Sequence, residues 1–536
     1  MFLIYYILLA FSLIGYGFAA SRILNLKFEN FGFYGLLGIS FLTFFSYISS
    51  LFFIHDYFFN TTILYVGLAL FILIIKFEKK LLKNFYELII IFLFLIIFIY
   101  VKKNHDDFGY YHFPYTYLLT QIEHPLGLGQ LNNGFRNHSS LFFLSSLFYL
   151  PGISINLLHL APVYFLGFTN IILLNYIRDK NSFDNFKFAN FFALLVFSFV
   201  NIFFYRLAEH GTDRSGMIIV FLLILLLTNI QHQRFEKMSY DRIYFSCILS
   251  TLLISLKTYY IIYIPLILYF LIDIFRFNIL KILKTKTFLY CFLFFFTTIL
   301  YNFINSGCLI YPAAFTCFEN IYWTINKDTI EKVNIWYELW AKSGASPNFV
   351  VDNRIDYIKN FNWLPNWIDN YFFNKVSDFL LGLFFLIIIF FIFFKKYKKE
   401  NKKTNYFKLK ILLLIIFVYL IEWFLKHPAL RYGGYHLIAI LCFIPFCIWF
   451  DRLKINFIEF NKKSIVIILM VTLVFLTRNI IRIDNETKMY GDNSFINYSY
   501  NYDDKFYNRY LYIIKENQSS YKKIKKLGFS FLITMK

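Results

Sequence analysis

Apolar segments of about 15 to 23 residues recur along most of this chain and are separated by short charged loops. A helix of about 20 apolar residues crosses the hydrocarbon core of a bilayer. Only a helix or a closed barrel satisfies its backbone hydrogen bonds in lipid, and these apolar runs are continuous rather than alternating. The sequence therefore predicts an all-α integral membrane protein with about 14 transmembrane helices.

The overall composition agrees with this fold class. Of the 536 residues, 59% are hydrophobic and 16% are charged, which excludes a soluble domain of any size. The net charge of +21 arises mostly from basic residues in the loops between spans, where they signal topology, so we expect no nucleic-acid partner. The first apolar segment has neither a basic region before it nor a small-residue cleavage site, which favours a retained span over a signal peptide.

The predicted spans group into regions along the chain. They lie near 1–19, 32–54, 62–76, 86–101, 154–176, 188–205, 216–230, 243–256, 259–275, 287–304, 378–395, 411–426, 434–450 and 463–479. The predicted regions are three N-terminal helices (1–85), a transmembrane core (86–304) with an external loop at 102–138, a Trp-rich external loop domain (305–377), C-terminal helices (378–479) and a polar, external tail (480–536). Residues 139–150 are too short to cross and are stopped by Pro151, so we expect a helix lying at the membrane surface.

The basic loops predict the orientation of the chain. Lysine and arginine are concentrated in the loops 76–85, 178–187, 231–242, 276–286, 395–410 and 451–463. Cytoplasmic loops carry the excess of Lys and Arg, so these loops are assigned to the cytoplasm. The polar loops 102–138, 208–216, 305–312 and 427–436 then fall on the opposite face, as does Lys257. Separate loops that bring acids, histidines and arginines to one face predict a single site there.

The stretch "NHDDFGYYHFPY" (104–115) holds the most unusual residues of that face. Asp106 and Asp107 directly follow a span, where partial desolvation raises the pKa of a carboxylate and suits it to act as a general base. His105 and His112 flank the acids, and Asp107 is the preferred base because Asp106 is nearer the span end. An N-cap of the helix beginning near Tyr110 is the structural alternative. His and Asp can bind a divalent metal, but no spacing here is diagnostic, so no cofactor is expected.

Three cations are expected on the same face. Arg214, Lys257 and Arg431 lie at span ends beside Gly, Asp or Pro. Arginine offers a planar fork that matches phosphate, and lysine offers a compact point charge. These residues predict a clamp for a phosphate-bearing lipid, with snorkelling towards lipid headgroups as the alternative.

The segment 305–377 carries two further signals. Five of the seven tryptophans lie in it, namely Trp323, Trp336, Trp340, Trp363 and Trp367. Indole rings stack on sugars, and they also anchor helices at the membrane interface, and both interpretations stay open. Cys308 and Cys317 lie nine positions apart around Pro312, and we expect them to form a disulfide in an oxidising compartment.

These motifs resemble those of the GT-C superfamily of membrane glycosyltransferases over roughly residues 86–450. The acidic pair followed by "YYHFP" resembles the first catalytic loop of that superfamily, and "SGCLIYP" and "PALRYGGY" resemble loop motifs of bacterial GT-C-like membrane proteins. The resemblance implies transfer of a sugar from a polyprenyl-phosphate donor to an acceptor on the non-cytoplasmic face. This chain departs from the family, because three spans precede the span leading into the loop, and "HDYFF" (55–59) is the rival acidic loop.

The resemblance also implies roles for individual residues. It implies Asp106 or Asp107 as the catalytic base, and it maps its phosphate-binding residues loosely to Arg214, Lys257 and Arg431. From its place in the same loop as the acids, we expect His112 to take part in catalysis. We expect His105, Tyr111 and Trp363 to contact the acceptor or the sugar. The expected partners are a polyprenyl-phosphate-linked sugar, a glycan, lipid or protein acceptor, and the lipids of a bacterial inner membrane.

Two other functions fit parts of the sequence. A polysaccharide polymerase or ligase would depend on Arg and His rather than on an Asp base, and Arg354 in the long loop would then matter more than Asp107. A transporter or lipid flippase would place ionisable residues near the bilayer midplane, where Glu422 and Lys257 are the candidates. The charged residues crowd one surface instead, so transport ranks below transfer.

The predicted topology can be tested by labelling single cysteines. Cysteines placed in 102–138, 208–216, 305–377 and 427–433 should react with a membrane-impermeant thiol reagent in intact cells. Labelling of 208–216 only after lysis would contradict a shared site.

Overall fold

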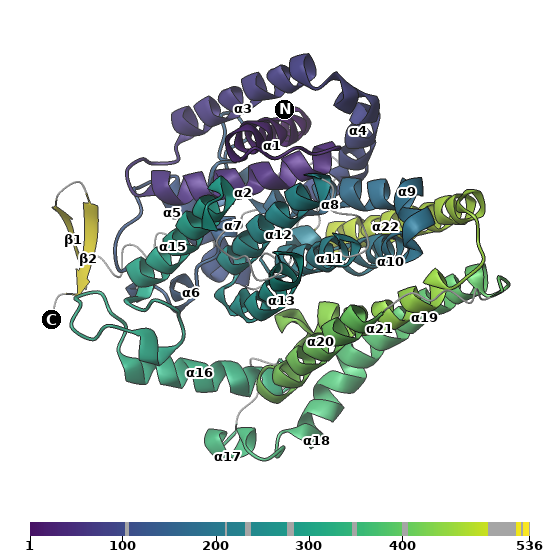
Figure 1. The fold of residues 1–536 in the computed structure, drawn as a ribbon. Helices are drawn as coiled ribbons and strands as arrows, with labels where there is room; N and C mark the ends of the chain where they lie inside the picture. Colours follow the sequence, from purple (N-terminus) through teal and green to yellow (C-terminus); the bar gives the residue numbers. More distant parts are fainter. Residues whose placement is uncertain are drawn as a thin grey trace.

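The computed structural model describes residues 1–101, 107–209, 212–230, 237–275, 283–345, 351–398, 406–490, 521–526 and 529–534. Helices make up most of this part of the chain (Figure 1). The helices of its first third are α1 (Phe2–Leu24), α2 (Phe31–Ser50), α3 (Tyr57–Phe77), η1 (Lys79–Asn84), α4 (Phe85–Phe94), η2 (Leu95–Ile99), η3 (Phe108–His112), α5 (Phe113–Leu119), η4 (Leu128–Gln130), α6 (Asn133–Arg136), α7 (Ser140–Ser146), η5 (Ile155–Leu160) and α8 (Ala161–Arg178).

The rest of the chain continues the same pattern. The helices of the middle part are α9 (Lys180–Asn185), α10 (Lys187–Phe203), η6 (Leu207–Glu209), α11 (Asp213–Ile230), α12 (Lys237–Leu256), η7 (Thr258–Tyr263), α13 (Ile264–Phe275), α15 (Lys286–Ser306) and η8 (Ala314–Thr316). The last helices are α16 (Lys327–Lys342), α17 (Arg354–Ile358), α18 (Leu364–Trp367), η9 (Ile368–Val376), α19 (Ser377–Phe394), α20 (Phe407–Lys426), η10 (Leu430–Tyr432), α21 (Gly434–Asp451) and α22 (Phe457–Tyr490).

Among the described residues, nine helical segments are long and apolar enough to cross a membrane. They are Phe2–Leu24, Phe31–Ser50, Tyr57–Phe77, Leu81–Ile99, Ile155–Arg178, Lys286–Ser306, Leu364–Phe394, Gly434–Asp451 and Phe457–Met489. Lys187–Phe203 and Thr258–Ile272 are shorter apolar helices. The predicted spans 216–230, 243–256 and 411–426 fall within α11, α12 and α20. The architecture is that of an all-α, multi-pass membrane protein, and the count of 14 spans stays a prediction.

Polar side chains at the ends of the apolar runs set where several spans begin. Asn30 accepts hydrogen bonds from the first amides of α2, and Asp56 accepts one from Phe59 N at 2.8 Å at the start of α3. Thr285 caps α15 in the same way. The opposite end of α15 is closed by Gly307, whose φ of 77° lies in the left-handed region that favours glycine.

Two glycines allow α1 and α2 to pack closely. A methyl group added at Gly17 would overlap the carbonyl oxygen of Tyr34, and one added at Gly38 would overlap that of Leu13. Such small residues bring helix backbones together in membranes, where association depends on direct packing. The same core extends from α1 and α2 to α8 and α12, so the N-terminal helices are part of the main helical body.

The segment 139–150 is where the surface-helix prediction is wrong. Its helix α7 is buried along its whole length and packs against α2, α5 and α12. Ser255 Oγ donates to Ser140 Oγ at 2.9 Å, and the Ser146 hydroxyl lies 2.7 Å from His55 Nδ1. These bonds satisfy the serines inside the protein, so the segment can be buried despite its polar groups.

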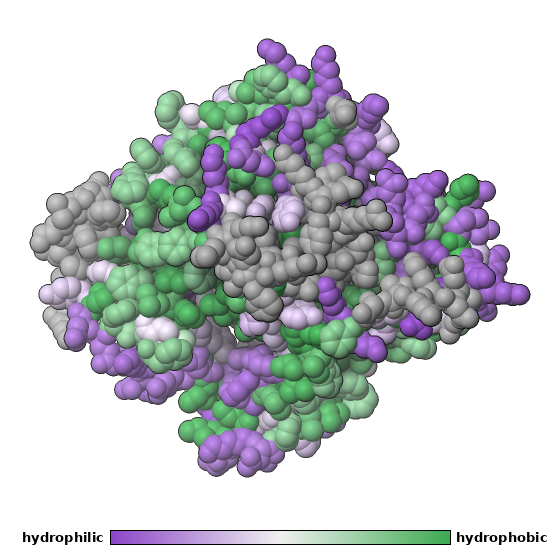
Figure 2. Space-filling view, viewed as in Figure 1, coloured by the Kyte–Doolittle hydropathy of each residue, from purple (hydrophilic) through white to green (hydrophobic). Residues whose placement is uncertain are grey.

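Charged elements gather at two opposite sides of the helical body. We call the side with η1, α9 and the start of α22 the basic face, and the side with α6, α16 and α17 the loop face (Figure 1). The space-filling view shows hydrophilic side chains at the right-hand edge near α9 and at the lower left near α16, with hydrophobic side chains over much of the surface between them (Figure 2). Lipid replaces water over such a surface, so the exposed Phe384 and Leu469 on α19 and α22 are in a favourable environment.

The loop face is built largely by residues 305–377. Cys308 and Cys317 form the predicted disulfide, with their Cα atoms 3.9 Å apart. They begin a small apolar cluster with Tyr311, Ile325 and Ile330. This cluster is separate from the main core, and α16, which contributes Ile330 to it, also contacts α20.

The C-terminal part departs from the expected division at 479. Helix α22 continues to Tyr490, so the residues beyond 479 begin as helix rather than as tail. Strands β1 (Tyr521–Lys526) and β2 (Phe529–Thr534) form an antiparallel hairpin, in which Tyr521 pairs with Thr534. This hairpin is a small exception to the all-α class.

A leucine at Gly38 should weaken the packing of α1 on α2. The added side chain has no room beside the Leu13 carbonyl, and overpacking of this kind costs about 1–3 kcal/mol. Thermal unfolding of the purified protein in detergent measures the loss. Ala69→Leu is the matched control, because Ala69 is exposed on α3. Equal stability of the two variants would contradict the close approach.

Candidate functional site

The carboxylate of Asp107 lies on the loop face where the chain enters the helices of that side. Asp107 directly precedes η3, a π-helical turn that runs into α5. Short π-helical turns are rare in proteins, and those that do occur are often found at functional sites. The Asp107 side chain is 28% exposed, so it is accessible while partly shielded from water.

Arg431 joins two carboxylates that are far apart in the sequence. It lies in η10, the short turn between α20 and α21. Its Nη2 donates to Asp107 Oδ2 at 2.6 Å, and its Nε donates to Asp213 Oδ2 at 3.2 Å. The planar guanidinium thus presents different N–H groups to the two acids, which a lysine could not do in the same geometry.

Lys257 completes the group from a break between two helices. Helix α12 ends at Leu256, and Lys257 lies in an extended conformation before η7. This break turns its ammonium towards the second Asp213 oxygen, Oδ1, with which it forms an ion pair. The Asp213 side chain is only 7% exposed, so this acid is the most buried member.

Asp107, Asp213, Lys257 and Arg431 therefore form one ion cluster from four separate parts of the chain. Burial alone lowers the pKa of Arg431, but the attraction of Asp213 and Asp107 outweighs burial and leaves this pKa well above its ordinary value. The cluster holds two acids and two bases, and each acid has a basic partner.

Arg214 is next to the ion cluster but is held differently. Its guanidinium lies 4.6 Å from the ring centre of Phe204 and 4.2 Å from that of Tyr435. The residue is 8% exposed, and no carboxylate lies within 4 Å of it in the described part of the chain. The two ring planes are nearly perpendicular, at 88° to each other, and Arg214 Nη1 also lies 3.9 Å from Met217 Sδ. The cation–π contacts with the two rings stabilise the charge of Arg214.

Tyr111 and Trp340 are among the aromatic residues that border the ion cluster. Burial raises the pKa of Tyr111, and the neighbouring Asp107 carboxylate adds to the shift. The indole of Trp340, on α16, lies 5.6 Å from the Arg431 guanidinium. Trp363, the tryptophan expected to contact a sugar, is 1% exposed and packs against Trp367 and Phe424 instead. A sugar would reach it only if that packing opened, whereas Trp340 is already beside the cluster.

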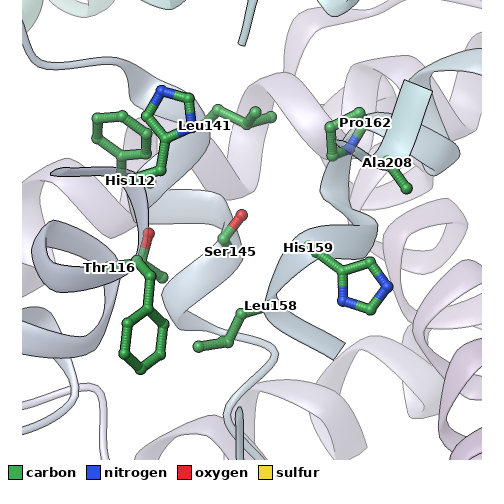
Figure 3. Close-up of a pocket in the computed structure, with 10 residues that line it drawn as sticks. His112, Thr116, Leu141, Ser145, Leu158, His159, Pro162 and Ala208 are labelled. Carbon is green, nitrogen blue, oxygen red and sulfur yellow. The ribbon is translucent and has the colours of Figure 1, made fainter. Parts of the chain in front are cut away.

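His112 lies in a different environment from Asp107. It lines a small cavity of about 30 Å³, with Thr116 on its own side, Ser145 in the middle, and His159 and Ala208 opposite (Figure 3). A volume of this size holds a water molecule but not a sugar. The structure therefore places His112 at a small, mostly apolar cavity that Thr116, Ser145 and His159 also line.

The remaining predicted residues fall outside the described part of the chain. His105 and Asp106 both lie in the interval 102–106, so their roles stay predictions. Within the described ranges, no three or more His, Cys, Asp or Glu side chains are grouped to hold a metal ion.

Asp213 is the functional candidate that sequence reasoning missed. It was part of the polar loop 208–216, but only its neighbour Arg214 was singled out. Its position as the first residue of an apolar helix, next to an arginine, was the available signal. The partners Lys257 and Arg431 lie 44 and 218 residues away, and no local pattern reveals such pairs.

Replacing Arg431 with Gln should destabilise the protein, because two carboxylates then lose the cation between them. We expect a loss of about 1–3 kcal/mol, since the groups are partly exposed. Adding Asp107→Asn to the Arg431 variant should restore part of the lost stability, because one of the two negative charges is removed. Thermal unfolding in detergent measures this double-mutant cycle. Arg354→Gln, an exposed cation on α17, is the control. Unchanged unfolding of the single Arg431 variant would show that the ion cluster contributes nothing.

Comparison with known proteins identifies the family and no closer relative. No curated protein and no solved structure matches the chain. The sequence profile of one family matches residues 1–438, a region that includes every member of the ion cluster. The chain belongs to the family described as Domain of unknown function (DUF8201).

Proposed function

We propose that this protein is a membrane glycosyltransferase that transfers a sugar from a polyprenyl-phosphate donor to an acceptor hydroxyl at the loop face. The observation that carries the proposal is the ion cluster, in which Arg431 and Lys257 hold Asp107 and Asp213 together. This reaction needs two kinds of group in one place. One is a carboxylate that accepts a proton, and the other is a set of cations that bind a phosphate.

Asp107 is the proposed base. Its ion pair with Arg431 stabilises the negative charge of the carboxylate, which is the form that accepts a proton. The acceptor oxygen attacks the anomeric carbon of the sugar, and its proton passes to Asp107. The bond from that carbon to the phosphate oxygen breaks, and its electron pair leaves with the lipid phosphate. A single displacement of this kind inverts the configuration at the anomeric carbon.

Arg431 and Lys257 are the proposed ligands of the departing phosphate. Both are paired with aspartates in the structure, so a phosphate would compete with these carboxylates for the same N–H groups. A phosphate that draws Arg431 away from Asp107 would free that carboxylate for the acceptor. In this proposal, binding of the donor and activation of the base are therefore linked through Arg431.

Asp213 has a positioning role in this scheme. It is the most buried member of the cluster and contacts both cations, which keeps Arg431 and Lys257 beside each other. Trp340 supplies an indole face next to Arg431, where a sugar could stack.

The proposed setting is a bacterial inner membrane with the loop face outside. The concentration of Lys and Arg in the loops of the basic face supports a cytoplasmic assignment for that face. The Cys308–Cys317 disulfide lies on the loop face, and disulfides persist in oxidising compartments such as the periplasm.

The two alternative functions receive less support. Arg354, which a polymerase or ligase would use, is exposed on α17 and is not part of the ion cluster. Glu422, a candidate for transport, is exposed and lies four residues before Lys426 at the end of α20. Within the described part of the chain, neither residue is joined to other charged groups in a pathway through the helices.

Replacing Asp107 with Asn should abolish most of the transfer activity. The amide keeps the shape of the side chain but cannot accept the proton, and loss of a general base costs about 10²- to 10⁴-fold in rate. Lipid-linked intermediates and surface glycans, compared between cells with the wild-type protein and cells with the variant, provide the measurement.

Asp56→Asn is the matched control for this experiment. Asp56 lies in the rival acidic loop and caps α3, and Asn caps helices about as well as Asp. The control should transfer sugar at the wild-type rate. Full activity of the Asp107 variant, or loss of activity in the Asp56 variant alone, would overturn the assignment of the base.

A further inference from the structure

A second, larger cavity lies at the end of α22 and is separate from the ion cluster. Its volume is about 610 Å³, and its walls come from α22 and from the residues that follow α10. The polar residues that line it are Tyr205, Arg206, Arg478, Arg482, Asn485, Glu486 and Lys488. Arg482 Nη1 also donates to the carbonyl oxygen of Tyr100 at 3.1 Å, which joins the cavity wall to the end of the fourth predicted span.

Most of these cations have carboxylate partners. Arg206 donates to the buried Glu209, with its Nε 2.8 Å from Oε2. Arg482 lies 3.3 Å from Glu486 and 3.9 Å from Glu209. Lys488 pairs with Asp484 at 2.6 Å, but both side chains are largely exposed, and such a pair contributes little.

Arg478 differs from the others. Within the described ranges it has no carboxylate within 4 Å, so four cations face three acids around this cavity. Its guanidinium stacks on Tyr205 at 3.9 Å from the ring centre, and Nη1 donates to the Ile202 carbonyl at 2.8 Å. Stacking holds the guanidinium in place while its remaining N–H groups stay at the edge, available to an oxyanion.

The position of Arg478 along α22 places it at the depth of lipid headgroups. A helix rises 1.5 Å per residue, so the 34 residues of α22 extend about 51 Å, well beyond a hydrocarbon core of about 30 Å. The helix starts on the basic face with Lys462 and Lys463 near its first turns. The uncharged apolar run Ser464–Thr477 follows these lysines. Arg478, about 22 Å along the helix from Lys463, is the first charged residue after that run, and its long side chain reaches towards the headgroups on the loop face. Ile480 and Ile481 beside it are more than half exposed, a surface that suits acyl chains.

We propose that this cavity binds the phosphate group of an anionic lipid headgroup, with Arg478 as its main ligand. A basic cavity at headgroup depth, with apolar surface beside it, matches a molecule that joins a phosphate to a hydrocarbon tail. The site shares no residue with the ion cluster, and it does not depend on the proposed glycosyl transfer. A lipid phosphate group and free inorganic phosphate offer the same oxyanion to Arg478. The position of the cavity at the hydrocarbon boundary favours the lipid as the ligand.

The test uses the full-length protein in nanodiscs that contain phosphatidylcholine alone or with phosphatidylglycerol. Phosphatidylglycerol should raise the unfolding temperature of the wild-type protein, and Arg478→Gln should remove most of this rise and weaken binding about tenfold. Arg354→Gln, an exposed cation elsewhere on the loop face, should bind like the wild type.

A second variant and a competition with inorganic phosphate test the site and the identity of its ligand separately. Lys488→Gln changes an exposed residue at the rim, so it should fold normally and weaken phosphatidylglycerol binding about twofold to threefold. Inorganic phosphate at millimolar concentration should not displace the lipid, and displacement would overturn the lipid source. Equal stabilisation by both lipids, or unchanged binding by both the Arg478 and Lys488 variants, would overturn the site itself.

Discussion

A charged side chain is costly in hydrocarbon, and this constraint governs where chemistry can occur in the protein. With most of the chain committed to apolar helices, ionisable groups collect at the two faces where those helices end. Asp107, Lys257, Asp213 and Arg431 come from different turns and helix ends, yet all reach the loop face. Where they become partly buried there, each acid acquires a basic partner, which is what burial of a charge requires.

The residues around α10 and α11 connect the two charged regions of the loop face. Arg206 follows α10, lines the large cavity and donates to Glu209, and Asp213 at the start of α11 enters the ion cluster. Arg214, between the rings of Phe204 and Tyr435, links this part of the chain to α21. A shift of the chain between α10 and α11 would therefore move residues of both the large cavity and the ion cluster.

Much of the fold follows from hydrophobicity and charge along the chain, and each predicted span coincides with a helix. The break at Lys257 and the pairing of Cys308 with Cys317 were also predictable, because each depends on residues close in sequence. The burial of α7 was not, since its serines look suited to a surface until His55 and Ser255 supply partners. Asp213 and Arg478 were missed for the same reason, because their environments are created by residues far away in the chain.

The buried position of α7 has a consequence for how the chain assembles. Its polar contacts reach back to His55 and forward to Ser255, which is 115 residues after Ser140. Chains are made from the N-terminus, so α7 emerges well before α12, the helix that covers one of its sides. Until α12 is inserted, the serines of α7 have only their earlier partners. The interior beneath the loop face is therefore completed late, and the N-terminal helices must hold an unfinished, partly polar surface while the middle of the protein is still being synthesised.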